Sequence, residues 1–437
     1  MADIASFRGL RYDLSRSADP GALLAPPYDV VSDPERDRLE ASDPHNVIRL
    51  ELPRGDGDSK YAVARRVLDA WLAAGVLRLD DRPALYVYEQ QFDFPPAAAA
   101  ARSYTRRGFF CRLRLEPFAS RVVLPHEHTL AAPKEDRRKL MRATRTQLSP
   151  VFGLYRDPDG VTLAPLAAVD GATPTFDAST ADGCRHVLWS VTDPAVVGAL
   201  VRGLAGRQVM IADGHHRYET MLGLRDEVRP PGLAPGAAAA DWGLVFLARA
   251  EDPGLLVLPT HRLVRNLPGF DVEALRARAA SLFDIAIGDE TGAAAIEARL
   301  RDQGRVRVTF AVRAAGTLGT MWLGLRGDAE LAALGPPALR ALDVTVLHGL
   351  VLGPMLGIDA AAMARQAYLG YTHDTIQALG EVAAGRAQAA FLMNATPVDK
   401  VISACEAGFV LPQKSTYFQP KLATGLVMHG IDGPADV

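Results

Sequence analysis

The chain has 437 residues, enough for two or three domains, and its 49% hydrophobic and 23% charged residues are typical of a globular protein. A formal net charge of −3 gives no reason to expect general affinity for nucleic acid or an anionic membrane, and no apolar run approaches the roughly 20 residues of a membrane span. The first residues lack a signal-peptide pattern and the three Cys show no C-x-x-C spacing, so we expect a cytoplasmic, reduced protein.

The N-terminal half alternates between strand-like and helical patterns. Apolar residues that alternate or run together predict strands at 46–52, 84–92, 104–115, 149–155 and the start of 185–204. Apolar residues at helical spacing predict helices at 59–75, 134–146 and the rest of 185–204. The Ala- and Pro-rich stretch 95–103 is expected to be a flexible hairpin loop, and Ser32 or Asp33 is expected to cap a helix beginning at Pro34.

An apolar run in the middle of the chain ends in a dense polar cluster. Residues 208–212 predict a buried strand, which breaks at Asp213-Gly214 and continues as a helix to about residue 227. Asp213 is expected to cap this helix with its carboxylate, and Gly214 to allow a sharp turn. His215, His216 and Arg217 then stand at the helix start, where backbone amides and the helix dipole favour an anion. The pattern indicates a phosphate site, although an ordinary surface turn could imitate it.

The C-terminal half predicts a mixed α/β or α+β fold. Strands are expected at 242–250, 255–258 and 425–429, and a helix at 342–356. Residues 271–326 predict helix, strand, helix, strand and strand, and 373–396 predict a helix and then a strand. From these patterns we expect a core domain at 1–265, an auxiliary α/β region at 266–330, and a C-terminal region at 331–437 that completes the core.

Two further clusters could carry chemistry. His126-Glu127-His128 could hold a metal from a strand end, and in an extended backbone Glu127 would face away from both His residues, as a general base in a cleft would. A cluster exposed on a loop would show the same residues. Lys414-Ser415-Thr416 with Lys421 could clamp a phosphate, or could be a surface turn; these are two of only six Lys in a chain rich in Arg.

The helix at 134–146 carries Arg138 and Arg142 on one face, with Arg145 close by. These side chains could bind phosphates, but a charge run is more often a solvated helix face. His261 and His348 are expected to be packing or hydrogen-bonding residues. The common nucleotide and hydrolase motifs G-x-x-x-x-G-K-[ST], G-x-G-x-x-G, H-E-x-x-H and G-x-S-x-G do not occur.

Five motifs in order resemble the family called domain of unknown function 1015. They are Ala25–Val30, Leu85–Gln90, Leu124–Glu127, Ala212–Thr220 and Gln413–Phe418. Within the fourth, Asp213-Gly214-His215-His216-Arg217 resembles the D-G-H-x-R signature of the archaeal free-serine kinase in the ParB/sulfiredoxin-like superfamily. The resemblance implies a nucleotide-binding core of that type, using ATP or ADP with Mg²⁺.

Carried over by position, the resemblance implies roles for individual residues. The nucleotide phosphates would be held by Gly214, His215, His216 and Arg217, to which we add Lys414, Ser415 and Thr416. Asp213 and His215 would be catalytic, with Glu127 as the general base on chemical grounds. The substrate, serine or O-phosphoserine, would be bound by Tyr28, Asp29, His126, Arg142 and Lys421.

Three hypotheses follow from these residues. The first is a nucleotide-dependent phosphotransferase acting on serine or O-phosphoserine, with the direction of transfer open. The second is a ParB-like nucleotide-binding or interaction protein without turnover. The third is a metal-dependent hydrolase or phosphatase built on His126, His128 and the two histidines of the Asp213 motif. Nucleic-acid binding is not expected, because no basic recognition helix stands out.

Overall fold

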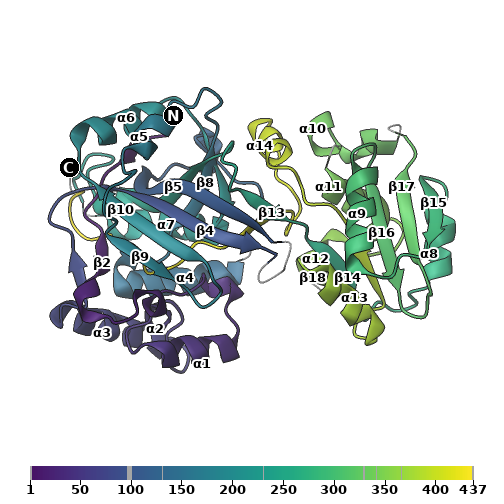
Figure 1. Cartoon of the computed structure of the whole chain (residues 1–437), viewed down its shortest axis with the longest axis horizontal. Helices are drawn as coiled ribbons and strands as arrows, with labels where there is room; N and C mark the ends of the chain where they lie inside the picture. Colours follow the sequence, from purple (N-terminus) through teal and green to yellow (C-terminus); the bar gives the residue numbers. More distant parts are fainter. Residues whose placement is uncertain are drawn as a thin grey trace. The chain divides into compact units, whose positions relative to one another are not determined.

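A computed structural model describes residues 2–95, 101–129, 131–229, 231–327, 330–340, 342–365 and 367–435. The chain forms two compact units (Figure 1). Unit 1 consists of Met1–Pro125, Thr129–Leu255 and Pro420–Val437. Unit 2 consists of His126–His128 and Leu256–Gln419. Part of the predicted loop 95–103 lies outside the described residues.

Unit 1 is built on a mixed β-sheet. Its described strands run in the order β6 (Val123–Leu124), β11 (Val209–Asp213), β8 (Val151–Tyr155), β12 (Trp242–Arg249), β5 (Arg102–Arg114), β4 (Leu85–Phe94), β10 (Arg185–Val191) and β9 (Phe176–Ser179), with β1 (Ile4–Ala5) paired to β5. β11 is parallel to β6, and β12 is parallel to β8, while the other neighbours are antiparallel. These strands confirm the predicted ones at 84–92, 104–115 and 149–155.

Both faces of the central part of this sheet are buried, because successive residues of its strands, which point to opposite faces, are apolar. On one face, Val87, Phe109 and Val245 pack with the helices α6 (Pro194–Leu204) and α7 (His215–Val228). On the other face, Tyr88, Phe110 and Phe246 contact one another, with ring centroids 5.2–5.4 Å apart. The small helix α5 (Leu163–Ala167) contributes Leu166 to the first of these cores.

A helical layer forms a second core in unit 1. Its helices are α1 (Asp33–Ser42), α2 (Ile48–Glu51), α3 (Ser59–Ala73) and α4 (Ala131–Thr144), beside the strand pairs β2 (Leu10–Tyr12) with β3 (Leu77–Leu79) and β7 (Thr146–Gln147) with β21 (His429–Gly430). The helices at 59–75 and 134–146 are thereby confirmed. α1 begins at Asp33 after Ser32, whose side chain makes no capping bond.

The predicted strand at 46–52 is wrong, because this segment is helical. Val47, Ile48 and Leu50 are all fully buried, so their alternation with polar residues does not mark one face of a sheet. Asn46 turns the chain into α2: its amide donates to the carbonyls of Ala22 (2.7 Å) and Leu24 (2.8 Å), and its oxygen accepts the Ile48 N–H.

Unit 2 contains an antiparallel sheet covered by helices. The described strands run in the order β15 (Phe283–Gly288), β17 (Thr320–Leu325), β16 (Thr309–Ala314), β19 (Ala389–Leu392), β14 (His261–Val264) and β18 (Leu369–Thr372). The helices are α8 (Val272–Ala279), α9 (Ala293–Gly304), α10 (Pro337–Arg340), α11 (Asp343–Val346), α12 (Ala360–Ala364), α13 (Thr375–Ala383) and α14 (Val398–Glu406). The pair β13 (Leu256–Leu258) and β20 (Tyr417–Gln419) stands apart from this sheet.

The order of elements predicted for 271–326 is confirmed, but the division of the chain differs from the expected boundaries. β19 pairs with both β14 and β16, so segments from 261–264, 309–314 and 389–392 share one sheet. Residues 331–419 therefore belong with 256–327, and only 420–437 return to unit 1. The predicted helix 342–356 is α11 followed by a π-helix at Leu347–Leu352, and the predicted strand 425–429 is reduced to β21. In the described residues, no helix has the length and apolar character needed to cross a membrane.

Candidate functional site

The Asp213 motif lies at the junction of a strand and a helix in unit 1, as predicted. β11 ends at Asp213, and the register between β11 and β8 shifts between Ile211 and Asp213. Gly214 has φ +93°, a left-handed conformation that favours glycine, and a Cβ there would lie 3.0 Å from the Arg217 guanidinium carbon. The motif therefore depends on Gly214 for both the turn and the close approach of Arg217.

Asp213 does not cap α7, and this prediction is wrong. The N-cap residue is Gly214, and no capping side chain is present among the described residues. The Asp213 carboxylate is instead held by two cations: Oδ1 accepts from Lys421 Nζ at 2.9 Å and Oδ2 from Arg217 Nη2 at 2.6 Å. Burial alone would raise the pKa of Asp213, but Lys421 and Arg217 outweigh it and hold that pKa well below its usual range. Asp213 is thus a fixed anion between two cations.

Arg217 is buried and links the motif to the Ala25–Val30 segment. Its Nη1 donates to the Pro150 carbonyl, and its side chain is 6% exposed. Burial acts to lower the pKa of Arg217, but Asp213, Asp29 and Tyr28 together raise it. Burial and Asp29 raise the pKa of Tyr28 to about 12. Tyr28 and Asp29, predicted to bind substrate, are therefore electrostatic neighbours of Arg217.

Two buried polar residues hold the Lys421 segment, and sequence reasoning missed them in this role. Gln90 Nε2 donates to the Lys421 carbonyl at 3.0 Å, and Arg106 Nη2 donates to the Pro420 carbonyl at 2.7 Å. Both side chains are fully buried, and burial lowers the pKa of Arg106 to about 10. Both strands carry several other polar residues, so no pattern in the sequence singled out Gln90 and Arg106 as the buried ones that need partners.

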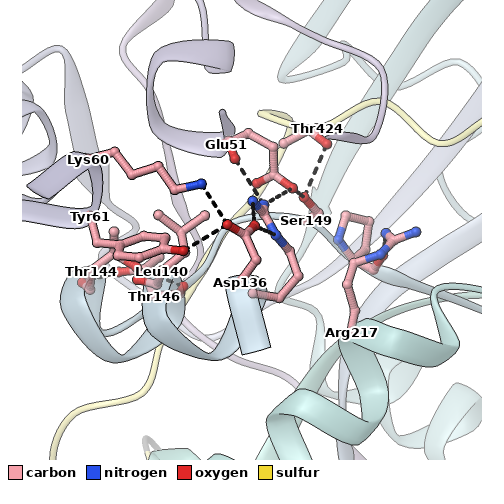
Figure 2. A network of polar contacts seen from close by, with 12 residues as sticks. Glu51, Lys60, Tyr61, Asp136, Leu140, Thr144, Thr146, Ser149, Arg217 and Thr424 are labelled. Carbon is pink, nitrogen blue, oxygen red and sulfur yellow. Dashed lines mark hydrogen bonds and ion pairs between the residues drawn. The ribbon is translucent and has the colours of Figure 1, made fainter. Parts of the chain in front are cut away.

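A polar network lies beside Arg217 in the helical layer (Figure 2). Glu51, which is 2% exposed, accepts hydrogen bonds from Ser149 (2.6 Å) and from Arg137 (3.3 Å). Asp136 accepts from Lys60 at 2.7 Å and from Tyr61 at 2.8 Å. Residues of this network and Arg217 line a cavity of about 20 Å³, room for a water molecule.

His215 and His216 form the first turn of α7, directly after Gly214. His215 is 8% exposed and His216 is half-buried. One turn later, Glu219 accepts hydrogen bonds from Thr129 (2.9 Å) and Lys134 (2.6 Å). These contacts fasten α7 to Thr129, just before α4, and to the first turn of α4 through Lys134.

Arg142, on α4, contacts α7 at the end that is far from Asp213. It forms an ion pair with Glu227, as does Arg138 at 3.0 Å. Glu227 is near the other end of α7, about 20 Å along the helix axis from Gly214. Arg145 pairs with Asp432 at 2.6 Å. Arg138, Arg142 and Arg145 are thus all in ion pairs. The geometry of the Asp213 turn does not support a substrate-binding role for Arg142.

His126, Glu127, Ser415 and Thr416 are brought together in unit 2. Glu127 Oε1 accepts the Ser415 backbone N–H at 2.8 Å, and His126 Nε2 lies 2.8 Å from Thr416 Oγ1. His126 Nε2 is also 3.5 Å from Glu127 Oε1, so the prediction that these side chains face opposite ways is wrong. Both side chains contact the 411–416 segment, and the backbone of Glu127 forms a parallel bridge with Leu411.

Lys414 occupies a left-handed turn in the same segment. Its φ is +58°, its side chain is exposed, and its carbonyl accepts from Arg262 Nη2 at 3.1 Å. Burial lowers the pKa of Arg262 to about 10 and the pKa of His261 to about 3. His261 is 1% exposed and lies 3.1 Å from Thr375 Oγ1, which confirms the packing role predicted for it.

Metal binding finds little support in either unit. Among the described residues, no three His, Cys, Asp or Glu side chains are grouped in a way that could hold a metal ion. The Asp213 turn does not fit a Mg²⁺ ligand set either, since each carboxylate oxygen already binds a cation.

Comparison with known protein families identifies the family of this chain. Residues 4–345 match the family described as "Protein of unknown function (DUF1015)". The chain belongs to the DUF1015 family. Among curated proteins, none matches this DUF1015 chain.

Solved structures similar to this DUF1015 chain have low identity. They include a conserved hypothetical protein from Pyrococcus furiosus (14% identity, TM-score 0.35, covering 73% of this chain and 95% of that one). A free serine kinase in complex with AMP has 13% identity and a TM-score of 0.36, covering 73% and 92%. SbnI with a C-terminal truncation, from Staphylococcus aureus, has 10% identity and a TM-score of 0.35, covering 73% and 87%. At these values we transfer no property from those proteins to this chain.

Proposed function

We propose that unit 1 binds the phosphate groups of ATP or ADP at the start of α7, and that the chain transfers a phosphoryl group to or from the hydroxyl of serine. In this proposal the unit 1 sheet with α7 is a nucleotide-binding core of the ParB/sulfiredoxin-like type. The observation that supports it is the placement of Lys421 and Arg217 around Asp213 at a helix start without a capping side chain. Lys421 and Arg217 bring two positive charges, beside the carboxylates of Asp213 and Asp29, to a helix start where the dipole also favours an anion.

The chemistry at this turn follows from what each side chain can do. Lys421 and Arg217 would neutralise phosphate charge, and Gly214 allows the phosphates to approach the backbone. Asp213 orients the two cations. Because its pKa is held low, it is a weak acceptor for the proton of an attacking hydroxyl, so we assign it positioning rather than base catalysis. The serine acceptor rests on the D-G-H-x-R resemblance alone.

Binding without turnover is the second candidate. It is favoured by the same observation, since a carboxylate held between two cations can organise an anion site without taking part in a reaction. This candidate predicts saturable nucleotide binding and no phosphoryl transfer.

The test combines binding with product analysis. Calorimetry with ATP and with ADP is run on the wild type, on Lys421→Met and on Arg142→Gln, the last removing a cation from the exposed pair with Glu227. We expect Lys421→Met to weaken nucleotide binding at least about tenfold and Arg142→Gln to leave it unchanged. Mass spectrometry then follows serine and O-phosphoserine with both nucleotides. Absence of nucleotide binding by the wild type at millimolar concentrations contradicts both candidates.

A further inference from the structure

A pocket lined by cations lies in the helical layer of unit 1. Its volume is about 330 Å³, and its lining consists of Arg36, Lys60, Arg137 and the segment 52–55, which includes Arg54. None of the described lining residues is a carboxylate. A pocket of this volume has room for a small ligand, and the charged side chains that line it are all cationic.

The pocket is formed where a glycine-containing loop meets the start of a long helix. Gly55 has φ +141°, and a Cβ there would lie 3.1 Å from both N and Cα of Lys60. Glycine therefore lets the loop approach the first turn of α3, a helix of 15 residues whose positive dipole end is at this point. The N-cap residue Asp58 makes no side-chain capping bond and pairs instead with Lys139 at 2.7 Å.

Carboxylates behind the lining hold the cations in place. Arg54 Nε donates to Glu40 at 2.8 Å and its Nη2 to Asp37. Lys60 donates to Asp136, as Figure 2 shows. Arg137 is bound to Asp136 and to Glu51. Each ion pair uses only part of the donor capacity of its Arg or Lys, so the lining keeps hydrogen-bonding capacity for an anion.

Arg36 gives an independent reason to expect a ligand. Its Nη2 atom is buried and has no hydrogen-bond partner among the described residues. Its Nε lies 3.4 Å from Glu40 Oε1, a long contact. A buried guanidinium nitrogen without a partner is costly, so Arg36 is a lining cation that its surroundings compensate only in part.

We propose that this pocket binds a phosphate dianion, either free or as the phosphate group of a small ester. Phosphate offers three or more acceptor oxygens and close to two negative charges, which suits the remaining donor hydrogens of Arg36 and Arg54 together with the Lys60 ammonium. A single carboxylate would satisfy fewer of these donors. The site does not depend on the function proposed for the Asp213 turn, since the lining contains none of Asp213, Arg217 and Lys421.

The experiment titrates the full chain with inorganic phosphate and, separately, with glycerol 3-phosphate, at constant ionic strength and with binding measured by calorimetry. The variants are Arg36→Gln and Arg54→Gln, each removing one lining cation. Arg65→Gln is the matched control, because Arg65 is on α3 and pairs with Asp69 outside the pocket. Circular dichroism and thermal unfolding establish that each variant folds.

We expect saturable binding by the wild type that weakens at least about tenfold in Arg36→Gln and in Arg54→Gln, and is unchanged in Arg65→Gln and Lys421→Met. Tighter binding of glycerol 3-phosphate than of phosphate would identify the ligand as an ester, and the reverse as free phosphate. Wild-type binding that Arg36→Gln and Arg54→Gln leave unchanged overturns the proposal, as does the absence of binding. Loss of binding in Lys421→Met alone would assign the phosphate to the Asp213 turn and also overturn it.

Discussion

Asp213 and Lys421 are 208 residues apart in the sequence, and Asp213 Oδ1 accepts a hydrogen bond from Lys421 Nζ at 2.9 Å. The contact is made because residues 420–437 return to unit 1 after the chain has built unit 2. Gln90 and Arg106 hold the backbone at this point through the Lys421 and Pro420 carbonyls. The candidate phosphate site in unit 1 is therefore complete only when the C-terminal segment is in place.

Asp213→Asn should destabilise unit 1 by about 2–5 kcal/mol, because it leaves the largely buried cations Arg217 and Lys421 without their counter-charge. Urea unfolding at neutral pH measures the loss. The exposed pair between Arg65 and Asp69 supplies the control Asp69→Asn, which should change stability little. An Asp213→Asn variant as stable as the wild type would show that the cations do not need this carboxylate.

The Asp213 carboxylate should make the stability of unit 1 depend on pH in acid solution. Since the pKa of Asp213 is lowered in the folded state, the unfolded state takes up its proton first as the pH falls. The stabilisation is present above the unfolded pKa of about 3.9 and is lost as pH falls from there towards the lower folded pKa. Over this range the stability difference between wild type and Asp213→Asn should shrink. A difference that stays constant contradicts the ion-paired state of Asp213.

Gly214→Ala should lower both stability and nucleotide affinity. Its φ of +93° costs about 1–2 kcal/mol for a residue with a Cβ, and that Cβ would press on the Arg217 guanidinium at 3.0 Å. Gly223→Ala is the matched control in the same helix, because a Cβ there has nothing within 4 Å. It should stabilise α7 by up to about 1 kcal/mol. Thermal unfolding and nucleotide titration of both variants test the pair, and equal behaviour would contradict the special role of Gly214.

The Asp213 motif was predictable because a buried strand, an Asp-Gly turn and a helix are all local patterns. The partner of Asp213 could not be predicted, because no local sequence pattern indicates that a Lys more than two hundred residues later will contact it. Asp is a favoured N-cap residue, but the Asp213 carboxylate is held by two nearby cations. Hydrogen bonds between charged groups are stronger than the bond to a backbone N–H that a cap would make.

The fold shows the same division between local and long-range information. The element order at 271–326 could be predicted, since each helix and strand has its own periodicity. The sharing of one sheet by β14, β16 and β19 depends on pairings between residues 75 to 129 positions apart, from Ala314 with Ala389 to Arg262 with Phe391, and periodicity does not encode these. At 46–52 the local pattern itself misled, because complete burial of Val47, Ile48 and Leu50 removes the contrast between faces.

Replacements of Glu127 can separate a structural role from a catalytic one. Glu127→Ala removes the acceptor of the Ser415 N–H, so hydrogen exchange at that amide should accelerate by about tenfold or more. Glu127→Gln keeps an acceptor oxygen and should leave the exchange close to that of the wild type. If Glu127 is also the general base, as the sequence predicts, Glu127→Gln should abolish phosphoryl transfer while keeping this protection. Unchanged exchange in Glu127→Ala would show that this carboxylate does not protect the Ser415 amide.

Buried histidines should make unit 1 lose stability in weakly acid solution. Burial lowers the pKa of His186 to about 4, while Tyr88 Oη lies 2.6 Å from its Nδ1. The unfolded state, with a His pKa of about 6.5, binds the proton first, so stability is full above pH 6.5 and falls towards pH 4, by about 1.4 kcal/mol per pH unit for this residue.

His186→Gln tests this dependence directly. The variant should be less stable at pH 7, and its stability should fall less steeply between pH 6.5 and pH 4, by the share that His186 contributes. His45→Gln is the control, because the His45 side chain is 39% exposed and its removal takes no buried imidazole from the fold. Urea unfolding at half-unit pH intervals measures both slopes. Identical slopes for the wild type and His186→Gln would show that His186 takes up its proton equally well in the folded and unfolded chains, and its burial would then have no part in the acid sensitivity of unit 1.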